Sequence, residues 1–374
     1  MTSTKAIQDY RLCAECLRRQ SSETAESALV GTAECFVCEG LMGKVGNVGR
    51  EVVRRARKYR FDSFAIGLSI PQGVQEREDE LRSNLKLQGR ETIRTQAARL
   101  IAAEVSAALR KSLNKTAPDL TVIVNMVDNQ ITVMSRPLFY YGRYTKPPGI
   151  RQKRETCGFC FGSGCQKCNM SGFGKGISVE ELLRGRLSRA CGSEKMIFSW
   201  IGSEDKESRV LPPGRPFIVE LKNPVRRDLP KRFSLRTGRG AIDVSRGRVL
   251  PAKPTNLPSF KFRTLIQATA GETIRHDRLT EIRRVFKHIQ VRFDRPHERP
   301  VMKTVYLAKA KGRGRHLVIE AVLDGGLPVK RFVSGDLVTP SVSEVLKTEV
   351  RCRTFDICEV KETGEFGFAK ITRL

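Results

Sequence analysis

The sequence is poor in the residues and runs on which several protein classes depend. It has four histidines and one tryptophan in 374 residues, and aromatic side chains make up only 7%. It contains no run of about 18 apolar residues, the length that a membrane-spanning helix needs. The first residues, MTSTKAIQDYRLCAEC, have no apolar core behind their charges, as a signal peptide would. We therefore expect a cytoplasmic protein with no membrane partner.

The motifs of several common active sites are also missing. There is no G-x-x-x-x-G-K-[ST] phosphate loop, no G-x-S-x-G elbow and no H-E-x-x-H metal motif. The glycines of GFGKG do not follow a strand and open a helix, as a dinucleotide site requires. An enzyme with this sequence has to use carboxylates, lysines or the reactivity of its own substrate.

Acidic residues are outnumbered by basic ones, 40 against 68, which gives a net charge of +28. Residues 1–50 are neutral overall, whereas residues 222–315 hold 25 basic and 7 acidic side chains. Such a field attracts polyanions, and contacts between basic side chains and phosphates release counterions. Nucleic acid is the first partner to consider.

A hydrophobic content of 40% over this length is enough for two packed domains.

The spacing of apolar residues predicts an α+β fold. Residues 51–61 have helical spacing and residues 61–71 alternate as a strand does. Residues 91–113 form the best helical pattern, and two strands flank a turn at Asp128–Asn129. After a break at Pro147–Gly149, a helix is expected to begin at Ser178 with Glu181 completing a capping box. Strands are predicted over 215–224, 260–269, 299–310, 315–324 and 357–360.

Eight of the eleven cysteines form C-x-x-C pairs. Because cytosolic thiols stay reduced, metal binding explains such pairs better than disulfides do. The first two pairs have 18 residues between them, which is the spacing of a structural zinc site: Cys13, Cys16, Cys35 and Cys38. Four thiolates close the coordination sphere, so such a site stabilises the fold and does no chemistry.

A second cluster has shorter spacing and several glycines that let the backbone turn tightly: Cys157, Cys160, Cys165 and Cys168. We predict zinc here too, with an iron–sulfur cluster or free thiols as the alternatives. The remaining thiols are expected to be buried small side chains: Cys191, Cys352 and Cys358.

Asp205 lies in a glycine-flanked loop, where an aspartate is usually a cap or turn residue. The segment GSEDKESR followed by GRPFIVELKNP, however, resembles the aspartate motif of the archaeal-type tRNA pseudouridine-54/55 synthases. The resemblance extends to both cysteine clusters and to FDSFAIGLSIP and RPLFYYGRYTKPPG in the THUMP-containing RNA-binding domain of that family. Near the C-terminus, DGGLPVKRFVSGD and TPSVSEVL resemble its basic-residue motif.

The resemblance implies that Asp205 is the nucleophile for a uridine. The N-glycosidic bond would break, the uracil would rotate, and C5 would be joined to the ribose in place of N1, with no cofactor consumed. Arg209 would keep Asp205 ionised or bind a phosphate.

Four further positions resemble the family's uridine pocket, and each has a role by that resemblance. Phe262, otherwise an ordinary core residue of a strand, would stack on the flipped base where the family commonly has tyrosine. Pro328 replaces another family tyrosine, and Val329 would pack beside the uracil. Lys330 would pair with Asp205 or a phosphate, and Ile357 would close the pocket.

The implied organisation is a zinc-bearing, THUMP-containing domain over residues 1–150, the second cysteine cluster as a linker over 151–176, and a catalytic domain over 177–374. The catalytic domain is expected to have a mixed, mainly antiparallel sheet. The partner would be the T-arm of tRNA, modified at uridine 54, 55 or both, with structural zinc and no small-molecule cosubstrate. The alternative is a zinc-bearing RNA-binding or assembly protein that kept the fold without turnover. A THUMP-containing methyltransferase or thiouridine enzyme is disfavoured because its glycine-rich nucleotide loop is missing.

Overall fold

The computed structural model describes residues 10–20, 29–87, 90–174, 176–193, 195–295 and 298–368. Its contacts divide the chain into two compact units, Met1–Pro137 with Lys222–Arg227, and Leu138–Leu221 with Asp228–Leu374. Each unit has its own hydrophobic core. No helix in the described ranges is long and apolar enough to cross a membrane.

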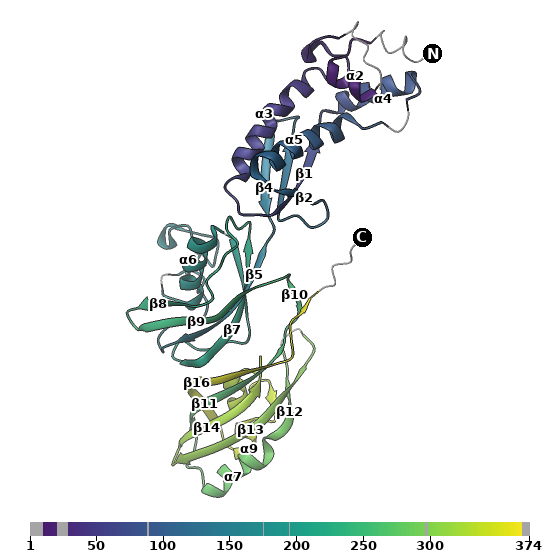
Figure 1. Cartoon of the computed structure of the whole chain (residues 1–374). Helices are drawn as coiled ribbons and strands as arrows, with labels where there is room; N and C mark the ends of the chain where they lie inside the picture. The colour runs from purple at the N-terminus through teal and green to yellow at the C-terminus, as the bar shows by residue number, and fades with distance from the viewer. Residues whose placement is uncertain are drawn as a thin grey trace. The chain divides into compact units, whose positions relative to one another are not determined.

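The first unit is built on a four-stranded sheet with the order β2-β1-β3-β4 (Figure 1). Its strands are β1 (Ser63–Ser69), β2 (Ser112–Leu113), β3 (Leu120–Asn125) and β4 (Gln130–Ser135). β1 is parallel to β2 and β3, and β3 pairs antiparallel with β4. The turn predicted at Asp128–Asn129 is confirmed: Asn129 has a φ of 58°, and the Asp128 carboxylate accepts a hydrogen bond from the Gln130 amide at 3.2 Å.

Two long helices, α3 (Leu41–Ala56) and α5 (Ile93–Leu109), pack on each other in this unit. The helix predicted over 51–61 overlaps the end of α3, which begins ten residues earlier at Leu41 and ends at Ala56. The helix predicted over 91–113 is shorter, because Arg110 adopts the left-handed conformation at a φ of 54° and β2 then pairs with β1. Shorter helices are α2 (Ala14–Gln20), α4 (Gln72–Asn84) and the 3-10 turn η2 (Thr32–Glu34).

The second unit contains an eleven-stranded sheet with the order β15-β12-β13-β14-β11-β16-β7-β5-β9-β8, and β6 pairs with β7 off this path. Neighbours are antiparallel from β15 to β16 and from β7 to β8, while β16 and β7 meet in parallel at Ile357 and Val210. The bounds are β5 (Leu138–Lys146), β6 (Lys195–Trp200), β7 (Val210–Lys222), β8 (Phe233–Thr237), β9 (Gly240–Leu250), β11 (Ser259–Ala270), β12 (Lys287–Phe293), β13 (Val301–Arg313), β14 (His316–Asp324), β15 (Val338–Thr339) and β16 (Val350–Thr363). The mixed, mainly antiparallel sheet is thus confirmed.

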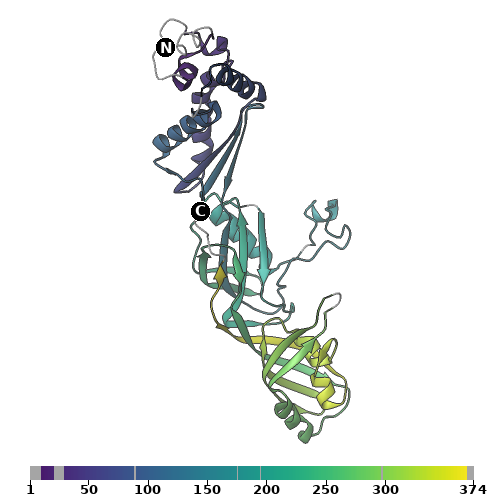
Figure 2. The ribbon, with the colours of Figure 1, turned by 90° about the vertical axis from the view of Figure 1, so that its right-hand side faces the viewer.

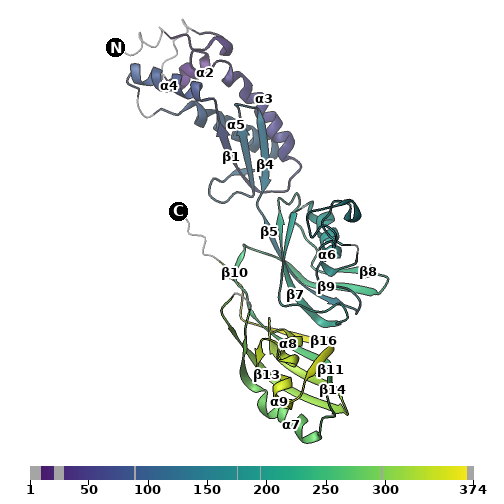
Figure 3. The same cartoon turned by 180° about the vertical axis from the view of Figure 1, so that it is seen from behind.

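The helices of this unit are α6 (Val179–Cys191), α7 (His276–Val285), α8 (Val329–Ser334) and α9 (Val342–Leu346). α8 packs on β16 near the site described below (Figure 3). Ser178 caps α6 as predicted, because its hydroxyl accepts the Glu181 amide hydrogen at 3.1 Å. The predicted capping box is only half formed, because the Glu181 side chain does not accept from the Ser178 amide. Smaller elements are the 3-10 turn η3 (Gln166–Cys168) and the pair β10 (Pro254–Asn256) and β17 (Gly367–Phe368).

The units divide the chain at Pro137, whereas the sequence places a boundary at residue 150. The reason is β5, which lies between β7 and β9 and therefore belongs to the sheet of the second unit. The five strands predicted after residue 177 correspond to β7, β11, β13, β14 and β16. Five further strands of this sheet were not predicted from the sequence: β5, β6, β8, β9 and β12.

Candidate active site

Asp205 lies in the loop between β6 and β7, within residues 201–209. The Ser208 amide donates to the Asp205 carbonyl at 3.2 Å, which closes a turn around the aspartate. The Asp205 side chain is 34% exposed. The carboxylate is therefore available to a ligand.

The backbone before Asp205 is held by a buried guanidinium. Arg215, on β7, donates to the carbonyls of Ile201 and Ser203 at 2.8–3.1 Å and forms an ion pair with Glu204 at 3.0 Å. The Tyr144 hydroxyl donates to the other Glu204 oxygen at 2.9 Å and accepts from the Gln152 amide at 3.0 Å. Burial raises the pKa of Tyr144 well above its usual value, so the phenol remains a donor. Glu204, the residue before Asp205, is thus held by both Arg215 and Tyr144.

The backbone after the aspartate is held by a lysine. Lys146, at the end of β5, is 3% exposed and donates to the carbonyls of Asp205, Lys206 and Ser208 at 2.5–3.2 Å. Burial lowers the pKa of Lys146, while the charges of Glu204, Glu207 and Asp205 oppose that shift. A single ammonium group thus fixes three peptide groups of the loop.

The carboxylate of Asp205 forms an ion pair with Lys330, which lies on α8, at an Nζ to Oδ2 distance of 2.8 Å. Lys330 was predicted to pair with Asp205 or with a phosphate, and the structure contains the pair with Asp205. The recorded hydrogen bonds of Arg209 are made by its backbone and not by its guanidinium. Its amide donates to the Asp356 carboxylate at 2.8 Å, and its carbonyl accepts from the Ile357 amide at 2.9 Å. The Arg209 backbone therefore ties the loop to β16, and its side chain is exposed.

A cavity of about 290 Å³ lies beside this loop. Four of the residues predicted for substrate binding line it, namely Phe262, Pro328, Val329 and Ile357. Gly202 and Ser203 bring the aspartate loop to its wall, while Asp205, Arg209 and Lys330 do not line the cavity. The structure therefore brings the predicted pocket residues together next to the charged pair, which stands beside the cavity.

Sequence reasoning misses an aromatic pair in the same cavity. Phe198 and Trp200, on β6, are stacked with an interplanar angle of 13° and a centroid distance of 5.4 Å. The guanidinium of Arg184 lies 5.3 Å from the Phe198 ring, and Lys153 also lines the cavity. The sequence contained a signal for this pair, because Trp200 is the single tryptophan and lies five residues before Asp205.

Phe262 is buried on β11, and the Arg215 guanidinium lies 5.2 Å from its ring centroid. The same guanidinium thus contacts both the predicted stacking residue and the loop of the aspartate.

Cys352, on β16, lies near the pair of Asp205 and Lys330. Burial raises the pKa of its thiol to about 11; the charge of Lys330 opposes this shift and that of Asp205 reinforces it. Cys191 is buried as expected, whereas Cys352 and Cys358 are only partly buried.

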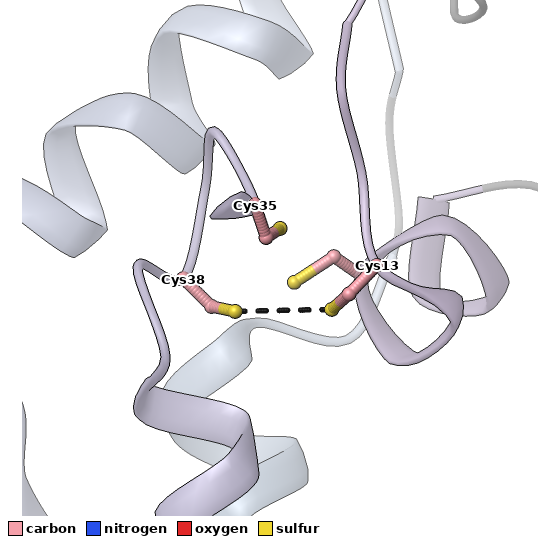
Figure 4. Close-up of side chains that lie close together, drawn as sticks. Cys13, Cys35 and Cys38 are labelled. Carbon is pink, nitrogen blue, oxygen red and sulfur yellow. Dashed lines mark hydrogen bonds between the residues drawn. The ribbon is translucent and has the colours of Figure 1, made fainter. Parts of the chain in front are cut away.

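The first cysteine cluster is buried in the core of the first unit. Cys13 and Cys16 come from the start of α2, and Cys35 and Cys38 come from the segment between η2 and α3 (Figure 4). The sulfurs of Cys13, Cys16, Cys35 and Cys38 all lie within 4.8 Å of one another, and Cys13 and Cys38 are 3.8 Å apart. Four thiolates at Zn–S distances of about 2.3 Å in a tetrahedron stand roughly 3.8 Å apart, so the geometry fits a zinc ion.

The second cluster has similar geometry in the second unit. Its sulfurs are 3.7–3.9 Å apart in the pairs Cys157–Cys165, Cys160–Cys168 and Cys165–Cys168. Backbone amides of Gly164, Cys165 and Gly172 donate to these sulfurs at 3.2–3.3 Å, which stabilises thiolates. In a four-iron cluster each thiolate binds a different iron, so its sulfurs stand farther apart. Both clusters can therefore hold one metal ion each, and the donor set suits zinc.

Known proteins resemble the chain over almost its whole length. A family model for the archaeal Pus10 THUMP domain matches residues 49–125, and one for the Pus10 C-terminal region matches residues 139–265. The tRNA pseudouridine synthase Pus10 of Nitrosopumilus maritimus is 27% identical over 372 residues, 96% of this chain and 97% of the relative. That of Cenarchaeum symbiosum is 31% identical over 331 residues, 88% of this chain and 81% of the relative.

Among solved structures, an archaeal box H/ACA sRNP Nop10-Cbf5 complex aligns with 62% of this chain and 50% of that chain, at 11% identity and a TM-score of 0.31. This likeness is too weak to support an inference.

The matched relatives are pseudouridine synthases, which are isomerases, and this chain is an enzyme of that class. It belongs to the Pus10 family. The THUMP match runs from the second half of α3 to the end of β3 in the first unit, and the C-terminal match begins in β5 of the second. The predicted fold class and family are confirmed.

Proposed function

We propose that the protein converts uridine to pseudouridine in the T-arm of tRNA, at position 54, 55 or both, with Asp205 as the nucleophile. The observation that carries this proposal is the placement of Asp205: a half-buried carboxylate, paired with Lys330 at 2.8 Å, on a loop fixed by Arg215 and Lys146 beside the cavity. A carboxylate needs only to be ionised and positioned to act as a nucleophile. The family name of the relatives supports tRNA as the substrate.

The residues around the cavity suit an extruded nucleotide. A base that leaves its stack needs a replacement surface, and Phe262 with Ile357 provides an apolar one. Val329 would pack beside the uracil, and Pro328 shapes the same wall. Lys330 would orient Asp205 while the glycosidic bond breaks and C5 replaces N1 at the ribose. All atoms of uridine are retained, so the reaction requires no cosubstrate.

Zinc would have a structural role in this enzyme. The eight cysteines of the two clusters would hold one ion each in closed four-thiolate sites, which leave no position for a substrate. The first site would stabilise the core around α2 and α3, and the second would stabilise the loop over residues 157–174. Such a tRNA-modifying enzyme is expected in the cytoplasm.

The test is to incubate the protein with an unmodified tRNA transcript and no added cofactor, and then to map pseudouridine by carbodiimide labelling and primer extension. Product at 54, 55 or both is expected. Asp205→Asn should bind the transcript with unchanged affinity and give no product. Product from the Asn variant would refute Asp205 as nucleophile, and tight binding without product from the unaltered protein would indicate a binding protein.

A further inference from the structure

The loop that carries the second cysteine cluster, residues 157–174, exposes aromatic side chains. We call it the cysteine loop. Of the aromatic side chains that the structure describes, only Phe159 and Phe161 are mostly exposed, at 68% and 83%. Met170, in the same loop, is 71% exposed. Figure 2 shows this loop standing off the body of the second unit. Apolar side chains gathered at such a position mark an interaction surface.

A metal ion held by the four cysteines would make this surface rigid. Phe161 and Met170 have positive φ values of 48° and 59°, a region that large side chains rarely adopt. Amides from within the loop donate to the cysteine sulfurs, so the backbone follows the cluster. A metal ion in a closed four-thiolate site would have no chemistry of its own and would hold the exposed rings in place.

The charge of the surface indicates a nucleic acid as its occupant. Lys167 is the one basic residue of the cysteine loop, which has no acidic residue, and residues 151–156 at its base add three basic side chains and one acidic one. The Lys167 ammonium lies 3.4 Å from the centroid of the Phe159 ring, so a positive charge accompanies the aromatic face. Exposed rings beside cations are the arrangement by which proteins stack unpaired bases and contact their phosphates. An apolar protein partner would not require the cations.

The base of the loop is continuous with the active site. Antiparallel pairing of Thr156 with Phe173 closes the loop, and pairing of Arg151 with Ser178 anchors it at the start of α6. Between these pairs, Lys153 lines the cavity, and Gln152 donates to Tyr144 in the network that fixes Glu204. The segment at the base of the cysteine loop therefore reaches the cavity.

We propose that the cysteine loop is a second RNA-binding site, where Phe159 and Phe161 stack on unpaired bases of the same RNA molecule that places its uridine in the cavity. Lys167 contacts the adjoining phosphate. The inference rests on the proposed function, because it assumes an RNA substrate in the cavity. It adds a binding site outside the pocket, with single-stranded RNA as its ligand.

The test compares two double variants that differ in ring content. In one, Phe159→Leu and Phe161→Leu keep the apolar surface and remove the stacking faces; in the other, both positions become tryptophan. Zinc content by elemental analysis and the thermal unfolding curve show that each variant keeps its fold. The dissociation constant for an unmodified tRNA transcript is measured by fluorescence anisotropy.

The leucine variant is expected to bind about tenfold or more weakly, since stacking contributes substantially for each base, and the tryptophan variant should bind as well as the unaltered protein. A 5-iodouridine-substituted transcript should crosslink to the cysteine loop. Equal affinity of all three proteins, or equal weakening by leucine and tryptophan, would overturn the proposal. Binding and pseudouridine formation are measured in separate assays, so failure of the leucine variant to bind differently is distinct from failure of the protein to form pseudouridine.

Discussion

Arg215 and Glu204 form an ion pair at 3.0 Å in which the two side chains are only 3% and 0% exposed. Glu204 precedes Asp205, and Arg215 also donates to two carbonyls of the same loop. Burial of a charge is costly unless it is paired and hydrogen-bonded, and here the pair determines where the aspartate stands. The position of the proposed nucleophile is thus built into the core of the second unit.

Replacing Arg215 with methionine should lower the free energy of unfolding of the second unit by about 3–5 kcal/mol, because Glu204 would remain buried without its partner. Urea denaturation followed by tryptophan fluorescence measures this through Trp200. The control is Arg351→Met, which removes an exposed pair with Glu349 and should leave the free energy of unfolding almost unchanged. Equal losses in the two variants would contradict the role assigned to Arg215.

Gly202→Ala should slow the reaction and weaken the fold locally. Gly202 has a φ of +78°, and an added Cβ would meet the Arg215 guanidinium, so the loop would have to move. A displacement of about 1 Å costs roughly 100-fold in rate. The matched control is Gly185→Ala in α6, where a Cβ meets no atom within 4 Å and helix propensity favours alanine. Single-turnover rates at saturating tRNA should fall for Gly202→Ala alone.

Much of this site could be predicted from the sequence because its parts lie in short, regular patterns. The cysteine spacing predicted both clusters. The family resemblance of the segments around Asp205, Phe262 and Val329 predicted one wall of the cavity. Alternation of apolar residues was sufficient for strands with one buried face, such as β11 and β14.

The missed parts depend on contacts between distant segments. β5 is buried along nearly its whole length, so it lacks the alternation that identifies a strand. The roles of Tyr144 and Lys146 arise only because β5 lies beside β7, which brings them to a loop about 60 residues away. α3 begins with a glycine-rich segment of low helix propensity, and tertiary packing overrides that propensity.

Zinc bound at the two cysteine clusters should be released at different rates. All four cysteines of the first cluster are buried, whereas Cys160 and Cys165 of the second are partly exposed. A chromogenic chelator should therefore remove one equivalent quickly and the other slowly, from about two per chain. Cys160→Ser should abolish the fast phase and leave one equivalent of zinc. Release in a single phase, or a slow phase lost in Cys160→Ser, would contradict this assignment.

Lys330→Met should reduce the single-turnover rate about 100-fold while the affinity for tRNA changes little, because the ammonium orients the Asp205 carboxylate and lies at the surface of α8. Lys330→Arg keeps the charge and should recover most of the rate. The control is Lys309→Met, since Lys309, on β13, pairs with Glu320 on β14 at 3.0 Å with comparable exposure and has no pair with Asp205. It should leave the rate unchanged even where it weakens RNA binding, because a lysine that contacts only phosphate contributes to binding and not to the chemical step. A loss of rate shared by both methionine variants would show that the effect of Lys330 is general electrostatics, and the role of its pair with Asp205 would have to be abandoned.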